Sequence, residues 1–212
     1  MFNFLNPVEL ILLVPALLVA VVVHEFAHAW AADRLGDPTP RIQGRLTLNP
    51  LAHLDLLGSL MFLLFRFGWG KPVQFDPYNL ENPRRDAAII SFAGPASNLV
   101  TAAVLAVITY FTLSIRGIPE IVDILTVRLI QFNVVLAVFN LVPIHPLDGG
   151  KVLIGLLPPD TAQDWDRIMQ QYGFIILIAL VLPIFGTSLI WSIIGPVINF
   201  LLGLFLPSSN WI

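Results

Sequence analysis

The chain has no cysteine and few charged residues, and both absences narrow what it can be. Without cysteine there is no disulfide framework and no thiolate metal site, so metal ligands would have to come from His, Asp or Glu. Charged residues make up 12% of the 212 residues and hydrophobic residues 57%, whereas soluble domains are about 25% charged. The net charge of −3 gives no reason to expect a nucleic-acid partner. The composition therefore predicts an integral membrane protein.

Long apolar stretches that do not alternate favour spanning helices over a β-barrel. Clear spans are predicted at Leu10–Ala32, Ala87–Leu113 and Leu125–Val142. The 34 residues of Gly173–Leu206 are too long for one span and short for two, so we expect a span plus a shorter or tilted helix.

Three shorter segments predict further features. Leu56–Phe65 is apolar but too short for a comfortable span, which indicates a re-entrant or interfacial segment. Arg41–Leu48 alternates between apolar and polar residues, and Lys71–Phe75 is also strand-like, so both are predicted as short membrane-associated strands.

The expected fold class is therefore an all-α, multi-pass helical bundle with a re-entrant segment and short strands. One membrane-embedded domain is expected over residues 1–212, with a core at about 8–150 and carboxy-terminal helices at 158–206.

Basic residues predict the orientation. Most of them fall between the first two spans: Arg34, Arg41, Arg45, Arg66, Lys71, Arg84 and Arg85. Lys151 and Arg167 follow the third span, and only Arg116 and Arg128 lie between. The positive-inside rule then puts Asp33–Asp86 and Gly149–Gln171 in the cytoplasm. The first span lacks a basic leader and is not expected to be a cleavable signal peptide.

One polar group interrupts the first span: His24, Glu25 and His28, spaced as His-Glu-x-x-His. Two His at i and i+4 share one helix face, so their rings can converge on one metal ion. Glu25 sits about 100° round the helix, where it can hold a water without being a ligand. A lone match of this kind is common in soluble helices, but ionisable residues at membrane depth are costly and usually functional.

Two histidines leave a catalytic zinc short of three protein ligands. Candidates for the third are Asp148, His145, His53, Asp55 and Asp123. Asp148 is favoured because Pro143 and Pro146 keep the chain out of a helix there and Gly149 permits close backbone approach. His53 is read as a capping or interfacial residue, with a gate or fourth ligand as the alternative. His145 is either a neighbour of the site or an ordinary loop residue.

Three motifs on successive spans together resemble the site-2 protease family of intramembrane zinc metalloproteases. They are His24-Glu25-x-x-His28, Gly94-Pro95-x-x-Asn98, and Asn140-x-x-Pro143 leading to Leu147-Asp148-Gly149. The resemblance covers residues 8–150. It implies one zinc ion held by His24, His28 and Asp148, Glu25 as catalytic base, and Asn98 near the site, orienting substrate backbone. No inserted or carboxy-terminal regulatory domain is visible, so a minimal, core-only member is expected.

The expected function is zinc-dependent cleavage of peptide bonds within or near transmembrane helices of protein substrates. The expected location is a bacterial or archaeal cell membrane, with the active site towards the cytoplasm. Two alternatives belong to other classes. A metal or proton transporter would show inverted repeats, which the sequence lacks. An inactive helix-binding scaffold would have lost Glu25 or a ligand, and all are present.

Overall fold

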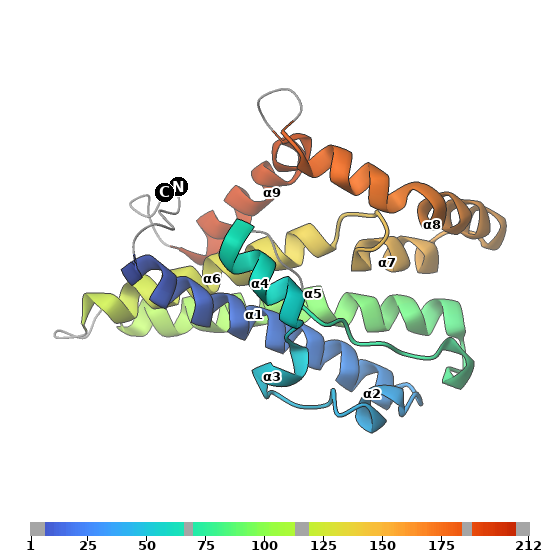
Figure 1. Ribbon diagram of the computed structural model, residues 1–212, viewed down its shortest axis with the longest axis horizontal. Coiled ribbons are helices and arrows are strands. Elements are labelled where there is room, and N and C mark those ends of the chain that lie inside the picture. Colours follow the sequence, from blue (N-terminus) through green and yellow to red (C-terminus); the bar gives the residue numbers. More distant parts are fainter. Residues whose placement is uncertain (1–6, 66–69, 113–118, 184–187, 207–212) are drawn as a thin grey trace.

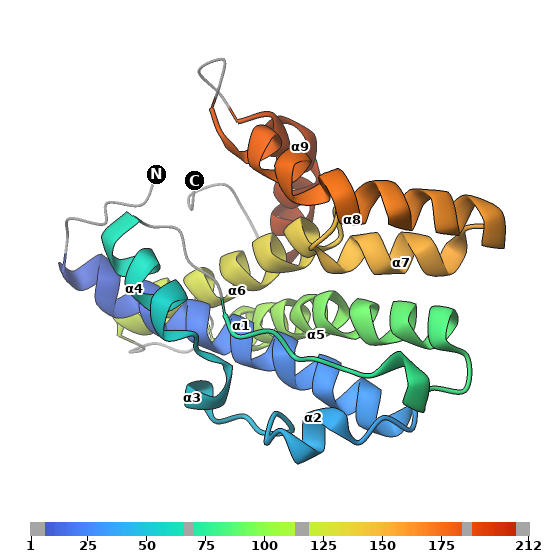
Figure 2. The same cartoon turned by 45° about the vertical axis from the view of Figure 1, so that its right-hand side comes forward.

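Three long helices pack together and form the core of the protein. The computed structural model describes residues 7–65, 70–112, 119–183 and 188–206; Arg66, Leu113 and Arg116, singled out above, lie outside them. The three helices are α1 (Pro7–Arg34), α5 (Pro83–Thr112) and α6 (Glu120–Asn140), and each contacts the other two. Figures 1 and 2 show α1 and α6 running in the same direction and α5 in the opposite one.

The predicted spans agree with these helices. Segments long and apolar enough to cross a membrane are Ile11–Arg34, Pro83–Phe111 and Ile121–Asn140. The helices begin a few residues before the predicted spans at 87 and 125 because polar first turns extend each helix beyond its apolar part. Pro15 and Pro95 lie inside α1 and α5 without ending them, as is tolerated in transmembrane helices.

The carboxy-terminal part forms three further helices. They are α7 (Asp148–Leu156), α8 (Pro159–Val181) and α9 (Leu189–Phe205). Helix α8 runs without a break from the polar stretch after Pro158 into the apolar stretch after Gly173, and the rest of Gly173–Leu206 forms α9 as a separate helix. A Cβ at Gly173 would lie 2.6 Å from the His145 carbonyl oxygen, so this glycine lets α8 pass close to the chain before α7.

The strand prediction for Arg41–Leu48 is wrong. A one-turn helix, α2 (Thr39–Ile42), occupies its start, and Gly44 has a positive φ of 68°. The alternation does not match burial, because Ile42 is 79% exposed whereas Arg45 is 5% exposed. The Arg45 guanidinium is buried because it donates hydrogen bonds to the carbonyls of Ala52 and Lys71.

Lys71–Phe75 lies in a drawn-out stretch of chain (Figure 2) but belongs to no strand within the described residues. A single antiparallel bridge joins Leu54 to Gly70 just before it. Leu56–Phe65 is helical and forms α4, which follows the short helix α3 (Pro50–His53). Whether α4 re-enters a membrane stays a prediction.

A buried carboxylate fixes one end of the extended segment. Asp37 is fully buried and accepts hydrogen bonds from Asp76 N (2.7 Å), Asn79 Nδ2 (2.8 Å), and Thr39 N and Oγ1 (3.0 and 2.6 Å). Burial alone would raise the pKa of Asp37, but these bonds to the charged form outweigh it and the pKa is lowered. At the other end, Lys71 N donates to the His53 carbonyl at 2.8 Å. The segment is therefore anchored at both ends beside α1.

Helix α7 packs against α5 so closely that a side chain is excluded. A Cβ on Gly155 would lie 2.3 Å from Ala88 Cβ, a rigid neighbour. We expect Gly155→Ala to lower the free energy of unfolding by about 1–3 kcal/mol through overpacking. The control is Gly203→Ala in α9, where a new Cβ meets nothing within 4 Å; it should be neutral or stabilising by about 0.5–1 kcal/mol. Thermal unfolding in detergent measures both, and equal effects would contradict the close α5–α7 contact.

Candidate metal centre

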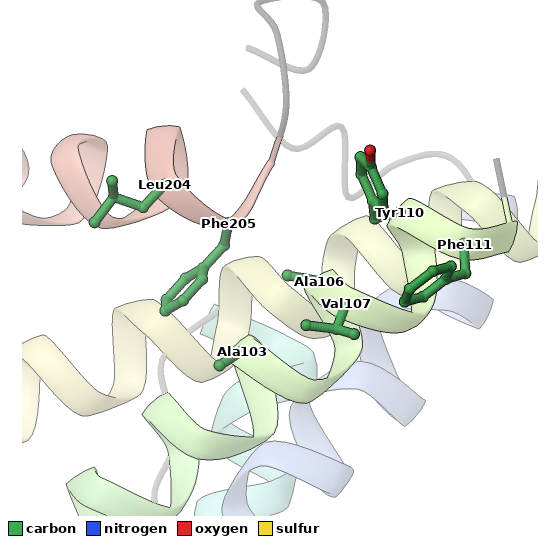
Figure 3. Close-up of a pocket in the computed structure, with 7 residues that line it drawn as sticks. All are labelled: Ala103, Ala106, Val107, Tyr110, Phe111, Leu204 and Phe205. Atoms are coloured by element: carbon green, nitrogen blue, oxygen red, sulfur yellow. The ribbon is translucent and has the colours of Figure 1, made fainter. Parts of the chain in front are cut away.

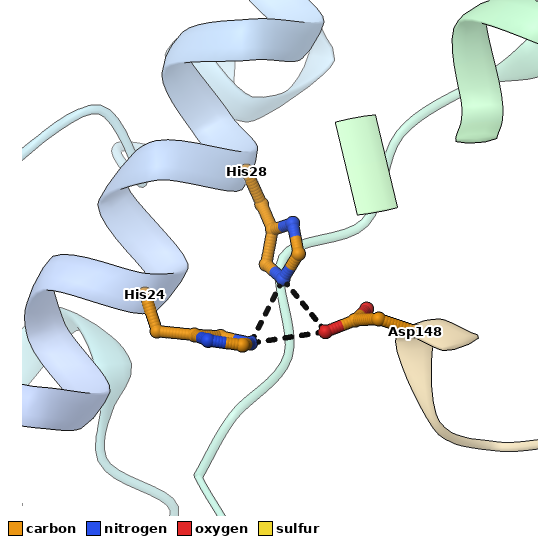
Figure 4. Close-up of side chains that lie close together, drawn as sticks. All are labelled: His24, His28 and Asp148. Atoms are coloured by element: carbon orange, nitrogen blue, oxygen red, sulfur yellow. Dashed lines mark hydrogen bonds and ion pairs between the residues drawn. The ribbon is translucent and has the colours of Figure 1, made fainter. Parts of the chain in front are cut away.

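Three donor atoms from two distant parts of the chain meet beside α1 (Figure 4). His24 and His28 lie one turn apart on α1, and their Nε2 atoms are 3.0 Å from each other. Asp148 Oδ2 lies 3.0 Å from His24 Nε2 and 3.2 Å from His28 Nε2. Both imidazoles are buried, and Asp148 is partly buried. The predicted trio is therefore brought together, 124 residues apart in the chain.

The hydrogen bonds on the far side of each ring decide which nitrogen carries the proton. His28 Nδ1 lies 2.7 Å from the Ile90 carbonyl oxygen, which can only accept, so Nδ1 is the donor. His24 Nδ1 lies 2.7 Å from Asn98 Oδ1, which also only accepts. In the neutral imidazoles both Nε2 atoms therefore carry no hydrogen and point a lone pair at Asp148.

With both rings neutral, three acceptors thus face one another with no hydrogen between them. In a buried site that arrangement is repulsive unless a metal cation lies among them or a ring takes up a second proton. Ligand atoms 2.0–2.1 Å from a tetrahedral zinc lie about 3.3 Å from one another, close to the observed separations of 3.0–3.2 Å. Two imidazoles and one carboxylate with an open fourth position match a catalytic zinc site. The residues present fit this ion.

A non-helical stretch between α6 and α7 brings Asp148 to the histidines. Helix α6 ends at Asn140, and α7 begins at Asp148, with Pro143 and Pro146 between them. A Cβ on Gly149 would lie 2.3 Å from the Leu141 carbonyl oxygen. Only glycine allows the start of α7 to fold back so closely on the end of α6, as the sequence predicted.

Gly94 makes the room that the two rings occupy. A Cβ at this position of α5 would lie 2.4 Å from His28 Nε2 and 2.8 Å from His24 Cε1. The α5 backbone therefore passes directly beside the imidazoles. In the sequence, Gly94 stands out only as part of a motif. The need for a glycine there could not be predicted, because spacing along one helix does not reveal a contact between two helices.

Glu25 lies next to the donors on α1 and is held from outside the helix. Its Oε2 accepts a hydrogen bond of 2.9 Å from Val73 N, in the extended segment. A backbone donor holds one carboxylate oxygen and leaves the other with acceptor capacity. Lys151 links α7 to the same segment, because its ammonium lies 4.5 Å from the centre of the Phe75 ring.

Asn98 lies behind His24, fully buried in α5. Its Oδ1 faces His24 Nδ1, and its Nδ2 donates to the Ala20 carbonyl at 2.9 Å and to Asn133 Oδ1 at 2.8 Å. The side chain thus contacts a candidate ligand directly. Its role in orienting substrate backbone stays a prediction. Sequence reasoning missed Asn133, because nothing in its spacing distinguishes it from other polar residues of α6.

The rival ligands lie elsewhere. Within the described residues, only His24, His28 and Asp148 form a group able to hold a metal. His53 is fully buried and its Nε2 donates to the Thr47 carbonyl at 2.8 Å. Asp55 accepts a hydrogen bond from Gly58 N at 2.7 Å, and His145 is exposed.

An apolar pocket of about 520 Å³ lies between α5 and α9 (Figure 3). None of the metal donors lines it. Its lining is Ala103, Ala106, Val107, Tyr110, Phe111, Leu204 and Phe205. The Tyr110 hydroxyl is the only polar side-chain group in that lining, so the pocket offers no group for hydrolysis.

The sequence matches peptidase family M50 over residues 12–127 and 120–182. It is 35% identical over 196 residues to YwhC of Bacillus subtilis, covering 86% of this chain and 85% of YwhC. It is 33% identical over 182 residues to Rip2 of Mycolicibacterium smegmatis, covering 81% of this chain and 67% of Rip2. The names of both relatives place them among the zinc metalloproteases. No solved structure matches the chain.

The choice of third ligand is tested by metal content. Asp148→Asn should weaken zinc binding by more than about 100-fold, because it removes the charged donor itself rather than an outer partner. His53→Ala and His145→Ala should retain one zinc per chain, since neither side chain belongs to the donor group. Elemental analysis of the three purified variants measures this. A zinc-loaded Asp148→Asn beside a zinc-free His53→Ala would show that His53 is the ligand.

Proposed function

This chain belongs to peptidase family M50, as a zinc metalloprotease, and we propose that it cleaves peptide bonds within or next to transmembrane helices of other membrane proteins. The position of the metal centre carries the proposal. His24 and His28 lie within Ile11–Arg34, a helix apolar and long enough to span a membrane. A hydrolytic site built into such a helix is accessible to substrates that are themselves in the membrane.

His24, His28 and Asp148 would hold a single zinc ion and leave one position open. When bound, the zinc supplies a Lewis acid for the peptide carbonyl and an activated water at neutral pH. Glu25 takes the proton from the attacking water and passes it to the leaving amine. The hydrogen bond from Val73 N to Oε2 holds the Glu25 carboxylate in place, while its other oxygen accepts and releases the proton.

A substrate helix must unwind before it can be cut, because each of its amides is hydrogen-bonded internally. We expect the unwound stretch to lie along Lys71–Phe75, which is extended, pairs with no strand among the described residues, and contacts Glu25 through Val73. Its backbone groups would then receive the substrate by strand addition. Asn98 was expected to orient substrate backbone; burial behind His24 favours instead an indirect role in this step.

We further propose a multi-pass arrangement in a bacterial or archaeal cell membrane. In it α1, α5 and α6 span the bilayer and the metal centre faces the cytoplasmic half. The orientation rests on the basic residues that cluster near the end of α1 and the start of α5, which Figure 1 shows at the same end of the core.

Glu25→Gln tests the catalytic role. The amide keeps the shape of the side chain but cannot accept the proton, so activity should fall by about 10²- to 10⁴-fold while zinc content stays at the wild-type level. A tagged single-span protein with helix-breaking residues in its transmembrane segment serves as substrate in detergent. Glu81→Gln, at an exposed position, is the matched control and should cleave normally. Appreciable turnover by Glu25→Gln would remove Glu25 from the role of base.

Cysteine labelling tests the orientation, in a chain with no cysteine of its own. Gln43→Cys and Asn82→Cys, both at exposed positions, should react with a membrane-impermeant maleimide only after the cells are permeabilised. Gly117→Cys, outside the described residues, should react in intact cells. Opposite sidedness of residues 43 and 82 would mean that the segment containing α4 crosses the membrane completely.

A further inference from the structure

A second buried asparagine stands behind the metal centre. Asn133 lies on α6, is fully buried, and has Asn98 and Leu129 rather than a metal donor as its hydrogen-bond partners. Its Oδ1 lies 2.8 Å from Asn98 Nδ2, and its own Nδ2 lies 2.8 Å from the Leu129 carbonyl oxygen. A polar side chain in an apolar helix interface calls for an explanation, and among the described residues the bond of Asn133 across the interface goes to Asn98.

The two amide groups can each point only one way. Asn98 faces the Ala20 carbonyl oxygen, which only accepts, so the atom there must be the NH₂ group. Asn133 faces the Leu129 carbonyl oxygen, so its NH₂ group is fixed in the same manner and its Oδ1 is turned towards Asn98. Both hydrogens of Asn98 Nδ2 are then used, and its Oδ1 is left facing His24.

This arrangement of hydrogen bonds determines which ring nitrogen of His24 carries the hydrogen. With Oδ1 facing it, His24 Nδ1 must carry a hydrogen, so in the neutral ring Nε2 is bare and directed at Asp148. If the Asn98 amide turned over, its NH₂ group would face Nδ1. The hydrogen would then move to Nε2, where it blocks metal binding. Asn133 and the Ala20 carbonyl together resist that turn, because a reversed Asn98 would bring its amide oxygen against two other oxygens.

We propose that Asn133 is a positioning residue of the metal centre, acting through Asn98 to hold His24 in the tautomer and orientation that bind zinc. The bonds run through three helices: α6 supplies Asn133, α5 supplies Asn98, and α1 supplies both Ala20 and His24. The proposal rests on the zinc site and is independent of the substrate. If Asn133 had no effect on zinc binding, the proposal of intramembrane cleavage would be unaffected. If intramembrane cleavage were disproved, the role of Asn133 at the zinc site would still stand.

The simpler role for Asn133 is a hydrogen bond that only joins two helices, which is common in membranes. The two roles differ in their effect on zinc. A joining bond affects the stability of the metal-free and zinc-bound forms alike and leaves the dissociation constant for zinc unchanged. A positioning residue changes that constant, by about tenfold at the lower end of the range for outer partners of metal ligands.

The experiment measures the zinc dissociation constant of the full chain in detergent, by competition with a chelator, beside thermal unfolding of the metal-free protein. Asn133→Leu should bind zinc about tenfold more weakly. Asn133→Asp should restore most of the affinity. A protonated carboxyl at this position can donate to the Leu129 carbonyl and accept from Asn98, as the amide does. Val134→Ala, at the next and equally buried residue of α6, is the control and should lower stability alone.

A double substitution tests whether the effect passes through Asn98. The affinity of Asn98→Ala should not fall further when Asn133→Leu is added. Nitrogen NMR of the metal-free protein, at a pH high enough for both rings to be neutral, should find the His24 proton on Nδ1 in the wild type and partly on Nε2 in Asn133→Leu. If Asn133→Leu does not fold, Asn133→Ser carries the same expectation, since its hydroxyl is too short to reach Asn98. Wild-type zinc affinity in a folded variant, or additive losses in the double variant, would overturn the proposal.

Discussion

The structure depends on one electrostatic constraint: when both rings are neutral, two imidazole nitrogens and a carboxylate oxygen, all bearing lone pairs, meet at about hydrogen-bond distance with no hydrogen among them. The Ile90 carbonyl and Asn98 Oδ1 hold the ring hydrogens on the far side, so neutral rings cannot relieve the repulsion by donating to one another. A cation does relieve it, and zinc suits this donor set. Helix α1, which carries both histidines, is apolar enough to span a membrane, where any uncompensated charge would be costly.

Close backbone approach is how the fold satisfies this constraint. The rings can occupy their place because α5 presents Gly94 there, and Asp148 reaches them because Gly149 lets α7 begin against the end of α6. On the other side of the site, hydrogen bonds hold the extended segment in place and connect it to Glu25. Asp37 anchors its end, and Val73 holds Glu25. Small residues and backbone donors thus position the chemistry, while the donor side chains come from α1 and the start of α7.

Much of this was predictable from the sequence, for identifiable reasons. The core helices follow from apolar length, and the metal trio follows from a His-Glu-x-x-His spacing together with the prolines before Asp148 and the glycines after it. The strand prediction at Arg41–Leu48 was wrong because alternation over eight residues is weak evidence. Arg45, expected on the polar face, is buried and donates to the carbonyls of Ala52, in α3, and Lys71. Asn133 was missed because its importance depends on a contact between helices that no spacing along one helix encodes.

The most direct test of the central claim is X-ray absorption at the zinc edge of the purified protein. The structure leads us to expect one zinc per chain in a four-coordinate shell of nitrogen and oxygen at about 2.0–2.1 Å. The multiple-scattering signal should correspond to two imidazoles. Three imidazoles would bring His53 or His145 into the site, and a six-coordinate oxygen shell would mean that the ion is bound elsewhere. Either result would contradict the assignment of His24, His28 and Asp148.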